Sequence, residues 1–220
     1  MQHKKVKLYT IVLFCLGLTG IQAQTVKDID GNDYKTVTIG SQTWMAENLM
    51  TTRYNDGTQI PLVNAATEWA ALTSPAYCNY KNTSNADTIH NYGRLYNWYT
   101  VNSEKVCPSG WHVPTDAEWT TLETFVGGIS IAGNKLKETG TTHWQAPNGA
   151  SGESMFSALP GGSRYSTGTF QSMGINGIWW NSTESDALDA WSRVMSYFSN
   201  SISRGDNYKS SGFSVRCIKD

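Results

Sequence analysis

Residues 107–119 read CPSGWHVPTDAEW, and this stretch decides how the middle of the chain folds. Thr115 followed three residues later by Glu118 is the pattern of a capping box, in which each side chain bonds to the backbone amide of the other residue. Pro114 favours an extended chain just before the helix, and Gly127 and Gly128 end it. The apolar residues between these signals follow at helical spacing: Trp119, Leu122, Phe125 and Val126. The stretch therefore predicts a helix that begins after Thr115 and packs on the core.

His112 is the candidate general base in this stretch. Thr115 and Glu118 already have a structural role in the helix cap, and a lone histidine is more often packed or hydrogen-bonded than catalytic. Elsewhere in the chain, His90 and His143 lack a metal-ligand spacing such as H-x3-H. The sequence also contains no G-x-S-x-G elbow and no phosphate-binding loop. We therefore expect no catalytic residue and no enzyme activity.

The first 23 residues have the pattern of a secretory signal peptide. Lys4, Lys5 and Lys7 precede an apolar run over residues 8–18, and small residues follow up to Ala23. The apolar run is too short to span a bilayer comfortably, and no later segment is more apolar. We expect a protein without a membrane span that is exported to the periplasm, the cell surface or the exterior.

Charge and composition limit the classes of function. The full chain has 17 basic and 18 acidic residues, and without the three lysines of residues 1–23 these become 14 and 18, a net charge of −4. Nucleic-acid-binding domains carry a basic stripe, so no nucleic-acid partner is expected. Aromatic residues make up 12% of the chain and charged residues only 16%, which favours short strands and shaped loops over long amphipathic helices. Residues 24–220 fit a single domain.

Three cysteines remain after residue 23: Cys78, Cys107 and Cys217. In an oxidising compartment one pair is expected, with one cysteine left over. No two are close in sequence, which argues against a zinc site and against a thioredoxin-like motif. We favour a disulfide between Cys107 and Cys217, because closing so long a loop is worth about 4–5 kcal/mol in the chain-entropy model. Cys78 is then free, although the other pairings stay open at this point.

Two further segments have local patterns. Residues 25–49 alternate polar and apolar positions around a glycine-containing turn, which predicts a β-hairpin. The turn sequence DIDGND, residues 28–33, also suggests calcium, but its glycine comes earlier than in an EF-hand loop. We therefore favour the turn and expect no cofactor, with calcium as the minor alternative and the metal-binding state left open. Residues 93–101, GRLYNWYTV, predict a short helix.

The region from residue 174 onward combines aromatic strands with polar turns. Alternation predicts strands over residues 178–180, 190–195 and 213–217, and another that begins near Ile202. Recognition surfaces use Tyr and Trp for rigid contact area and Ser, Asn and Gly for adaptable hydrogen bonds. The alternative is an ordinary polar sheet edge. The candidate binding residues of this surface are Trp180, Asn181, Trp191, Arg193, Tyr197, Arg204 and Tyr208.

Six motifs, in order along the chain, resemble a known family. They are WMAENL (44–49), GRLYNWY (93–99), CPSGWHVPTDAEW (107–119), SALPGGSR (157–164), WWNSTE (179–184) and GFSVRC (212–217). Together they are similar to the Fibrobacter succinogenes major paralogous domain family, over nearly the whole of residues 24–220. The resemblance implies an α+β, C-type lectin-like fold that is distantly similar to formylglycine-generating enzymes. It would have a twisted antiparallel sheet, two short helices and chain ends that lie close together.

The resemblance does not carry over the chemistry of these relatives. Formylglycine-generating enzymes hold copper with two cysteines near the chain end, and residues 198–216 offer no cysteine to accompany Cys217. Calcium-dependent C-type lectins use EPN or QPD and WND triplets, whereas this chain has Trp180-Asn181-Ser182. Many family members carry a second cysteine soon after the one that matches Cys78, and its absence here favours Cys78 as the free thiol. Related lectin-like domains display variable residues on the C-terminal surface.

We therefore expect an exported, non-catalytic binding module that contacts a glycan or protein outside the cell through its C-terminal surface. One alternative is an enzyme that uses Cys78 for thiol-based oxidative chemistry, which requires an exposed thiol of low pKa. Another is a structural envelope or adhesion component. The identity of the ligand and the oligomeric state do not follow from the residues.

Overall fold

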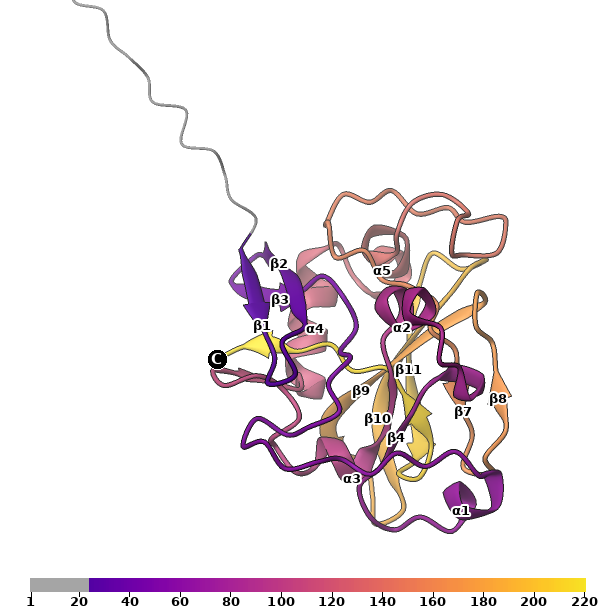
Figure 1. The fold of residues 1–220 in the computed structure, drawn as a ribbon. Coiled ribbons are helices and arrows are strands. Elements are labelled where there is room, and N and C mark those ends of the chain that lie inside the picture. Colours follow the sequence, from indigo (N-terminus) through magenta and orange to yellow (C-terminus); the bar gives the residue numbers. More distant parts are fainter. Residues whose placement is uncertain (1–23) are drawn as a thin grey trace, which may run out of the picture.

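The computed structural model describes residues 24–220. The predicted signal peptide at residues 1–23 lies outside the described residues. In this part of the chain the named strands form three sheets, and all their pairings are antiparallel. Helices lie around these sheets (Figure 1). The α+β class is thus confirmed, although the expected single sheet is divided into three.

The first sheet has the order β1 (Thr25–Lys27), β2 (Asp33–Ile39), β3 (Gln42–Met45), β13 (Ile218–Lys219) and β6 (Trp111–His112). The second has the order β11 (Ile202–Tyr208), β10 (Asp189–Ser196) and β9 (Asn176–Glu184). The third has the order β4 (Tyr77–Cys78), β5 (Leu95–Asn97), β12 (Gly212–Phe213), β7 (Ser163–Arg164) and β8 (Phe170–Gln171). The helices of the described chain are α1 (Ala66–Ala70), α2 (Ala86–Tyr92), α3 (Trp98–Val101), α4 (Asp116–Phe125) and α5 (Ile129–Leu136), with a 3-10 turn at Tyr80–Asn82.

The capping box opens α4 as the sequence predicts. The Thr115 hydroxyl accepts a hydrogen bond from the Glu118 amide at 3.2 Å, and the Glu118 carboxylate accepts one from the Thr115 amide at 2.7 Å. Gly127 and Gly128 follow the helix with φ of 111° and 98°. This left-handed backbone favours glycine, and it turns the chain from α4 into α5.

Both ends of the described chain lie in the first sheet. The last strand, β13, pairs with β3 on one side and with β6 on the other, and the marked C-terminus lies beside β1 in Figure 1. The disulfide between Cys107 and Cys217 confirms the predicted pairing, and Cys78 is the free cysteine. The expectation that the chain ends lie close together is therefore also confirmed.

The predicted strands and helices agree with the structure where the sequence pattern is long and differ from it where the pattern spans only a few residues. The hairpin over residues 25–49 forms as β1, β2 and β3. Residues 93–101 contain strand β5 before α3, because the Asn97 side chain accepts the Thr100 amide and so starts the helix only at Trp98. The predicted strand over residues 213–217 is interrupted between β12 and β13.

Aromatic side chains fill the core. Trp119 packs against Trp44, Phe156 and Trp179 at ring-centroid distances of 5.0, 5.9 and 6.4 Å. All nine tryptophans fall within residues 24–220, and seven of them are buried. The two that keep a half-exposed ring are Trp111 and Trp191. Large aromatic groups supply much of the burial energy of a core, so these two exceptions direct attention to the surfaces around them.

Four buried cationic side chains of the described chain bind chiefly main-chain carbonyl groups: Lys137, Arg164, Lys209 and Arg216. The Arg164 guanidinium donates to the carbonyls of Val63, Asn64 and Gly168 at 2.7, 2.8 and 3.0 Å. It also lies over the Trp69 ring, 4.5 Å from its centroid. Buried charge is costly unless it is hydrogen-bonded, so these bonds fix loops that have no strand or helix of their own.

The other three cations follow the same arrangement. Lys137 donates to the carbonyls of Ser196 and Ser199, each at 2.9 Å, and burial lowers the pKa of Lys137 to about 8. Burial likewise lowers the pKa of Arg216 to about 9; this guanidinium bonds to the Asn48 side chain and to the Phe156 carbonyl. Lys209 donates to the carbonyls of residues 186 and 187, each at 2.8 Å.

Candidate functional site

Three of the seven residues predicted for the C-terminal surface are buried, which corrects the sequence prediction. Trp180 is fully buried and donates its indole N–H to the Tyr96 carbonyl at 2.8 Å. Its ring lies 4.4 Å from that of Phe213. Asn181 is also fully buried, and Arg193 is 2% exposed. These side chains hold the scaffold together and do not form an exposed surface.

The reason is that strand β9 is covered on both of its faces. Trp179 belongs to the core cluster that includes Trp119 of α4, whereas its neighbour Trp180 belongs to the cluster on the other side of the sheet. Alternation within a strand places successive side chains on opposite faces, but it does not reveal that both faces are buried. Asn181, the next residue of β9, is also buried, and its side-chain amide donates to the Asp116 carboxylate at 3.2 Å.

Trp191 and Arg204 form the exposed part of the predicted surface. The Arg204 guanidinium carbon lies 3.3 Å from the Trp191 ring centroid, as expected for a cation–π stack. The Asp116 carboxylate accepts from Arg204 Nε at 2.9 Å and from Arg193 at 2.6 Å. Although partial burial acts to raise it, hydrogen bonds from Arg204 and Arg193 lower the pKa of Asp116. The Asp116 carboxylate, bonded to both guanidinium groups, therefore fixes the orientation of the stack.

Tyr208 lies near this stack, but Tyr197 does not. Tyr208 pairs with Asp189 at the open end of the β10–β11 ladder, and its side chain is 57% exposed. Tyr197 is next to the opposite end of β10, where its ring packs edge-to-face on Phe198 at 5.2 Å. The structure thus assigns Tyr197 to the hairpin turn and separates it from the other predicted residues.

A hollow of about 450 Å³ opens beside Tyr208, and we call it the Tyr208 hollow. The side chains of Tyr165, Asp189, Asp206 and Asn207 contribute to its lining. Burial first, and then the carboxylates of Asp206 and Asp186, raise the pKa of Asp189. The hollow thus combines two exposed aromatic rings with carboxylate and amide groups. Tyr165, which comes from the β7–β8 turn, was not among the residues predicted from the sequence.

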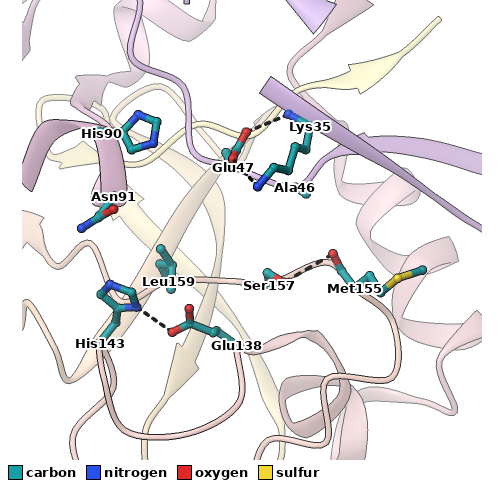
Figure 2. A pocket seen from close by; sticks show the side chains of 10 residues that line it. All are labelled: Lys35, Ala46, Glu47, His90, Asn91, Glu138, His143, Met155, Ser157 and Leu159. Atoms are coloured by element: carbon teal, nitrogen blue, oxygen red, sulfur yellow. Dashed lines mark hydrogen bonds and ion pairs between the residues drawn. The ribbon is translucent and has the colours of Figure 1, made fainter. Parts of the chain in front are cut away.

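A second hollow, of about 370 Å³, lies between α2 and the loop that contains Glu138 and His143. His143 accepts or donates a hydrogen bond with Glu138 at 2.7 Å, and Glu47 pairs with Lys35. Figure 2 shows these two pairs on different sides of the opening, with the His90 ring apart from both. Most ionisable groups of this second hollow are thus paired with each other, and no tryptophan contributes to its lining.

A third hollow, of about 550 Å³, lies beside the half-exposed Trp111, and we call it the Trp111 hollow. His112 lines its wall and bonds to Asp220 at 2.7 Å and to Glu118 at 2.9 Å, one carboxylate on each ring nitrogen. Although partial burial acts to lower it, the hydrogen bonds to Asp220 and Glu118 raise the pKa of His112. Because a carboxylate engages each ring nitrogen, the imidazole has no free nitrogen for proton transfer.

The three cysteines of residues 24–220 offer no reactive thiol at these hollows. Cys107 is oxidised in the disulfide with Cys217, and Cys78 is fully buried. Burial raises the pKa of Cys78 to about 12, and Arg164 offsets only part of this effect. A reactive cysteine requires an accessible thiolate, so Cys78 lacks the property on which thiol-based catalysis would depend.

The DIDGND segment forms a turn. The Asp28 carboxylate accepts hydrogen bonds from the amides of Asp30 and Asn32 and from the Tyr34 hydroxyl, at 3.0, 2.9 and 2.6 Å. These bonds commit the Asp28 oxygens to the turn itself. Over residues 24–220 no group of three or more His, Cys, Asp or Glu side chains has a geometry that could hold a metal ion.

The arrangement of motifs around these surfaces corresponds to a known domain. The profile described as Fibrobacter succinogenes major domain matches residues 37–219, which is most of the chain. The chain belongs to the Fibrobacter succinogenes major domain family. No curated protein and no solved structure matches it.

The residues matched to the Fibrobacter succinogenes major domain family include most of the candidate surfaces. The matched residues include Trp111, Trp191, Arg204 and the entire lining of the Tyr208 hollow. Strand β1 lies outside the match. Two residues that line hollows also lie outside it: Lys35 in the second hollow and Asp220 in the Trp111 hollow. The part of the chain that the structure describes has no helix long and apolar enough to cross a membrane.

Proposed function

We propose that this chain is an exported, non-catalytic binding module with a C-type lectin-like fold, which contacts a glycan or protein outside the cell. The contact surface is the exposed end of the β10–β11 ladder, formed by Trp191, Arg204 and Tyr208. The observation that carries the proposal is the Trp191–Arg204 stack, held by Asp116 and open to solvent. Closure of the domain by the disulfide between Cys107 and Cys217 supports an oxidising compartment.

The stack has the properties of a pre-organised anchor. Arg204 uses Nε for Asp116, and its two terminal nitrogens have no hydrogen-bond partner among the described residues. A guanidinium with free N–H groups above an indole ring suits planar acceptors such as amide, carboxylate and sugar hydroxyl oxygens. Because Asp116 already fixes the side chain, a ligand loses little affinity to the ordering of Arg204.

The Tyr208 hollow extends this surface. Tyr165 and Tyr208 are 42% and 57% exposed, and tyrosine contributes large contact area at a low cost in conformational entropy. Asp206 lies opposite Trp191 in the ladder and also lines the hollow. A ligand that contacts Trp191 can therefore also donate hydrogen bonds to the Asp206 carboxylate, which lies opposite Trp191.

The experiment is a comparison of purified variants on glycan and surface-protein arrays. Trp191→Ala and Tyr208→Ala are expected to reduce binding to the ligand that the wild type retains by about tenfold or more, as loss of an aromatic anchor does. Phe198→Ala is the matched control, because Phe198 is an exposed aromatic residue at the opposite end of the hairpin, and this variant should bind as the wild type does. Equal binding by all three variants, or no array signal for the wild type, contradicts the proposal. The second result favours an envelope or adhesion role.

A separate measurement addresses catalysis through Cys78. Iodoacetamide is expected to modify Cys78 only when denaturant opens the fold, because the thiol is buried and its pKa is raised to about 12. Mass spectrometry of the labelled protein reports the rate. Rapid labelling of the native protein would favour the thiol-based enzyme instead.

A further inference from the structure

We infer that the Trp111 hollow is a second ligand site, which binds a neutral sugar ring. Both the hollow and the Trp191–Arg204 stack adjoin the N-terminus of α4: Thr115 lines the hollow, and the next residue, Asp116, binds Arg204. The inference does not rest on the proposed function of the stack. The two sites contain different tryptophans and can fail separately.

The aromatic part of the site is Trp111 itself. One side of this residue packs against the core cluster that contains Val106 and Val113, and the residue also lines the hollow. Its position is fixed by β6, where it pairs with Lys219 of β13, and by a hydrogen bond from its amide to the Pro108 carbonyl at 3.0 Å. A rigid, half-exposed indole ring offers the apolar face on which the C–H groups of a sugar ring stack.

Uncommitted polar groups surround this ring. The Trp111 indole N–H, the Asn102 amide, the Glu104 carboxylate and the Ser182 hydroxyl have no side-chain hydrogen bond within residues 24–220. Asn102 and Glu104 are exposed, Trp111 and Ser182 are partly buried, and all four line the same hollow of about 550 Å³. Donors and acceptors placed around an aromatic ring match the hydroxyl groups of a pyranose. The volume also lies in the range of small-molecule sites.

The charge of the hollow selects a neutral ligand. Glu104 and Asp220 line it, and Glu118 bonds to His112, so three carboxylates accompany a single imidazole. A phosphate or an acidic sugar would meet net repulsion here. The carboxylate oxygens instead accept hydrogen bonds from hydroxyl groups. His112 takes no part as a free donor, because both of its nitrogens are bonded to carboxylates.

The test is calorimetric titration of the purified protein with hexasaccharides of glucose, mannose and xylose, together with a hexasaccharide of galacturonic acid. At least one neutral hexasaccharide is expected to bind. Trp111→Ala should weaken that binding by about tenfold or more, as removal of an anchoring aromatic group does. Trp111→Tyr, which keeps an aromatic face, should retain part of it, and Phe198→Ala, which truncates an exposed aromatic residue outside both proposed sites, should leave it unchanged.

Two readouts keep the inference falsifiable if Trp111→Ala is unstable. Glu104→Gln and Ser182→Ala change only the polar lining, and each should weaken binding while thermal unfolding stays the same. The indole N–H signal of Trp111, assigned by its loss in Trp111→Tyr, should shift on addition of the neutral sugar. No neutral hexasaccharide binding, binding that is insensitive to Trp111 and Glu104, or tighter binding of the galacturonic acid hexasaccharide would each overturn the inference.

Discussion

Arg193 and Arg204 face each other across the β10–β11 ladder and bind the same carboxylate, that of Asp116. Their side chains are 2% and 41% exposed. Arg193 also bonds to the buried Glu123 of α4, whereas Arg204 lies on Trp191 at the surface. Two directly paired residues of neighbouring strands thus differ: Arg193 belongs to a buried ion pair and Arg204 to a stack at the surface.

The difference teaches that the ladder has an inner part and an outer part. The inner part, with Arg193 and Met195, packs against α4 and the core. The outer part, with Trp191, Arg204 and Tyr208, extends past these contacts into solvent. One arginine of this hairpin therefore has a structural role and the other lies at the proposed contact surface. Substitutions in the two parts should differ in their effect on stability.

The largest expected difference is between Trp180→Ala and Trp191→Ala. Trp180 is fully buried, so its truncation should lower the free energy of unfolding by about 4 kcal/mol. Trp191 is half-exposed, and its truncation should cost less than about 1 kcal/mol. Urea unfolding followed by circular dichroism measures both values. Similar losses for the two variants would show that the outer part is as tightly packed as the inner part.

The two arginines provide the next comparison. Arg193→Ala leaves Glu123 buried without its cation and should destabilise the fold by about 3 kcal/mol. Arg204→Ala removes a partly exposed pair and should cost no more than about 1 kcal/mol. Thermal unfolding at one protein concentration reports both. A greater loss for Arg204→Ala would place the structural role at the surface.

His112 offers an ion pair of intermediate exposure, with a side chain that is 36% exposed. Its pKa is raised above 6.5 in the folded protein, so the folded state holds the proton more tightly than the unfolded state does. The stabilisation is complete below pH 6.5 and is lost as the pH rises through the raised pKa. Unfolding curves at several pH values should therefore show that the advantage of the wild type over His112→Gln decreases with increasing pH. An advantage that grows with pH would contradict this sign.

The smallest expected effect on stability is that of Arg204→Lys. Lysine keeps the charge that faces Asp116 but loses the planar stack on Trp191. We expect the free energy of unfolding to change by less than about 0.5 kcal/mol, while array binding falls as it does for Trp191→Ala. Unchanged binding by Arg204→Lys would show that charge alone, and not the stack, contacts the ligand.

Much of the scaffold follows from local patterns in the sequence. The capping box of Thr115 and Glu118 sets the start of α4, because both of its bonds form within four residues. The number of cysteines predicts one disulfide, and the favoured pairing of Cys107 with Cys217 is the one that the structure forms, although the residues alone left the other pairings open. The hairpin over residues 25–49 has a repeat long enough to establish its strands.

The candidate surfaces are less predictable, because they depend on contacts between distant segments. Trp180 and Trp191 have similar sequence surroundings, and only the packing of β9 between two clusters buries the first. Tyr165 reaches the Tyr208 hollow from the β7–β8 turn, which no local pattern indicates. Trp111 was not among the residues predicted for a binding surface, yet it is only partly buried and lines a hollow.

The buried lysines and arginines have a consequence for how the loops can change. Lys137 binds main-chain oxygens within residues 196–199, and Lys209 binds those of residues 186 and 187. Arg164 binds those of residues 63 and 64 in the same way. Every amino acid supplies that oxygen. The Val63 and Tyr197 side chains still pack on the core. At exposed positions of these segments, such as Asn64, Ala187 and Phe198, exchange of residues can therefore change the outer surface while the backbone bonds persist.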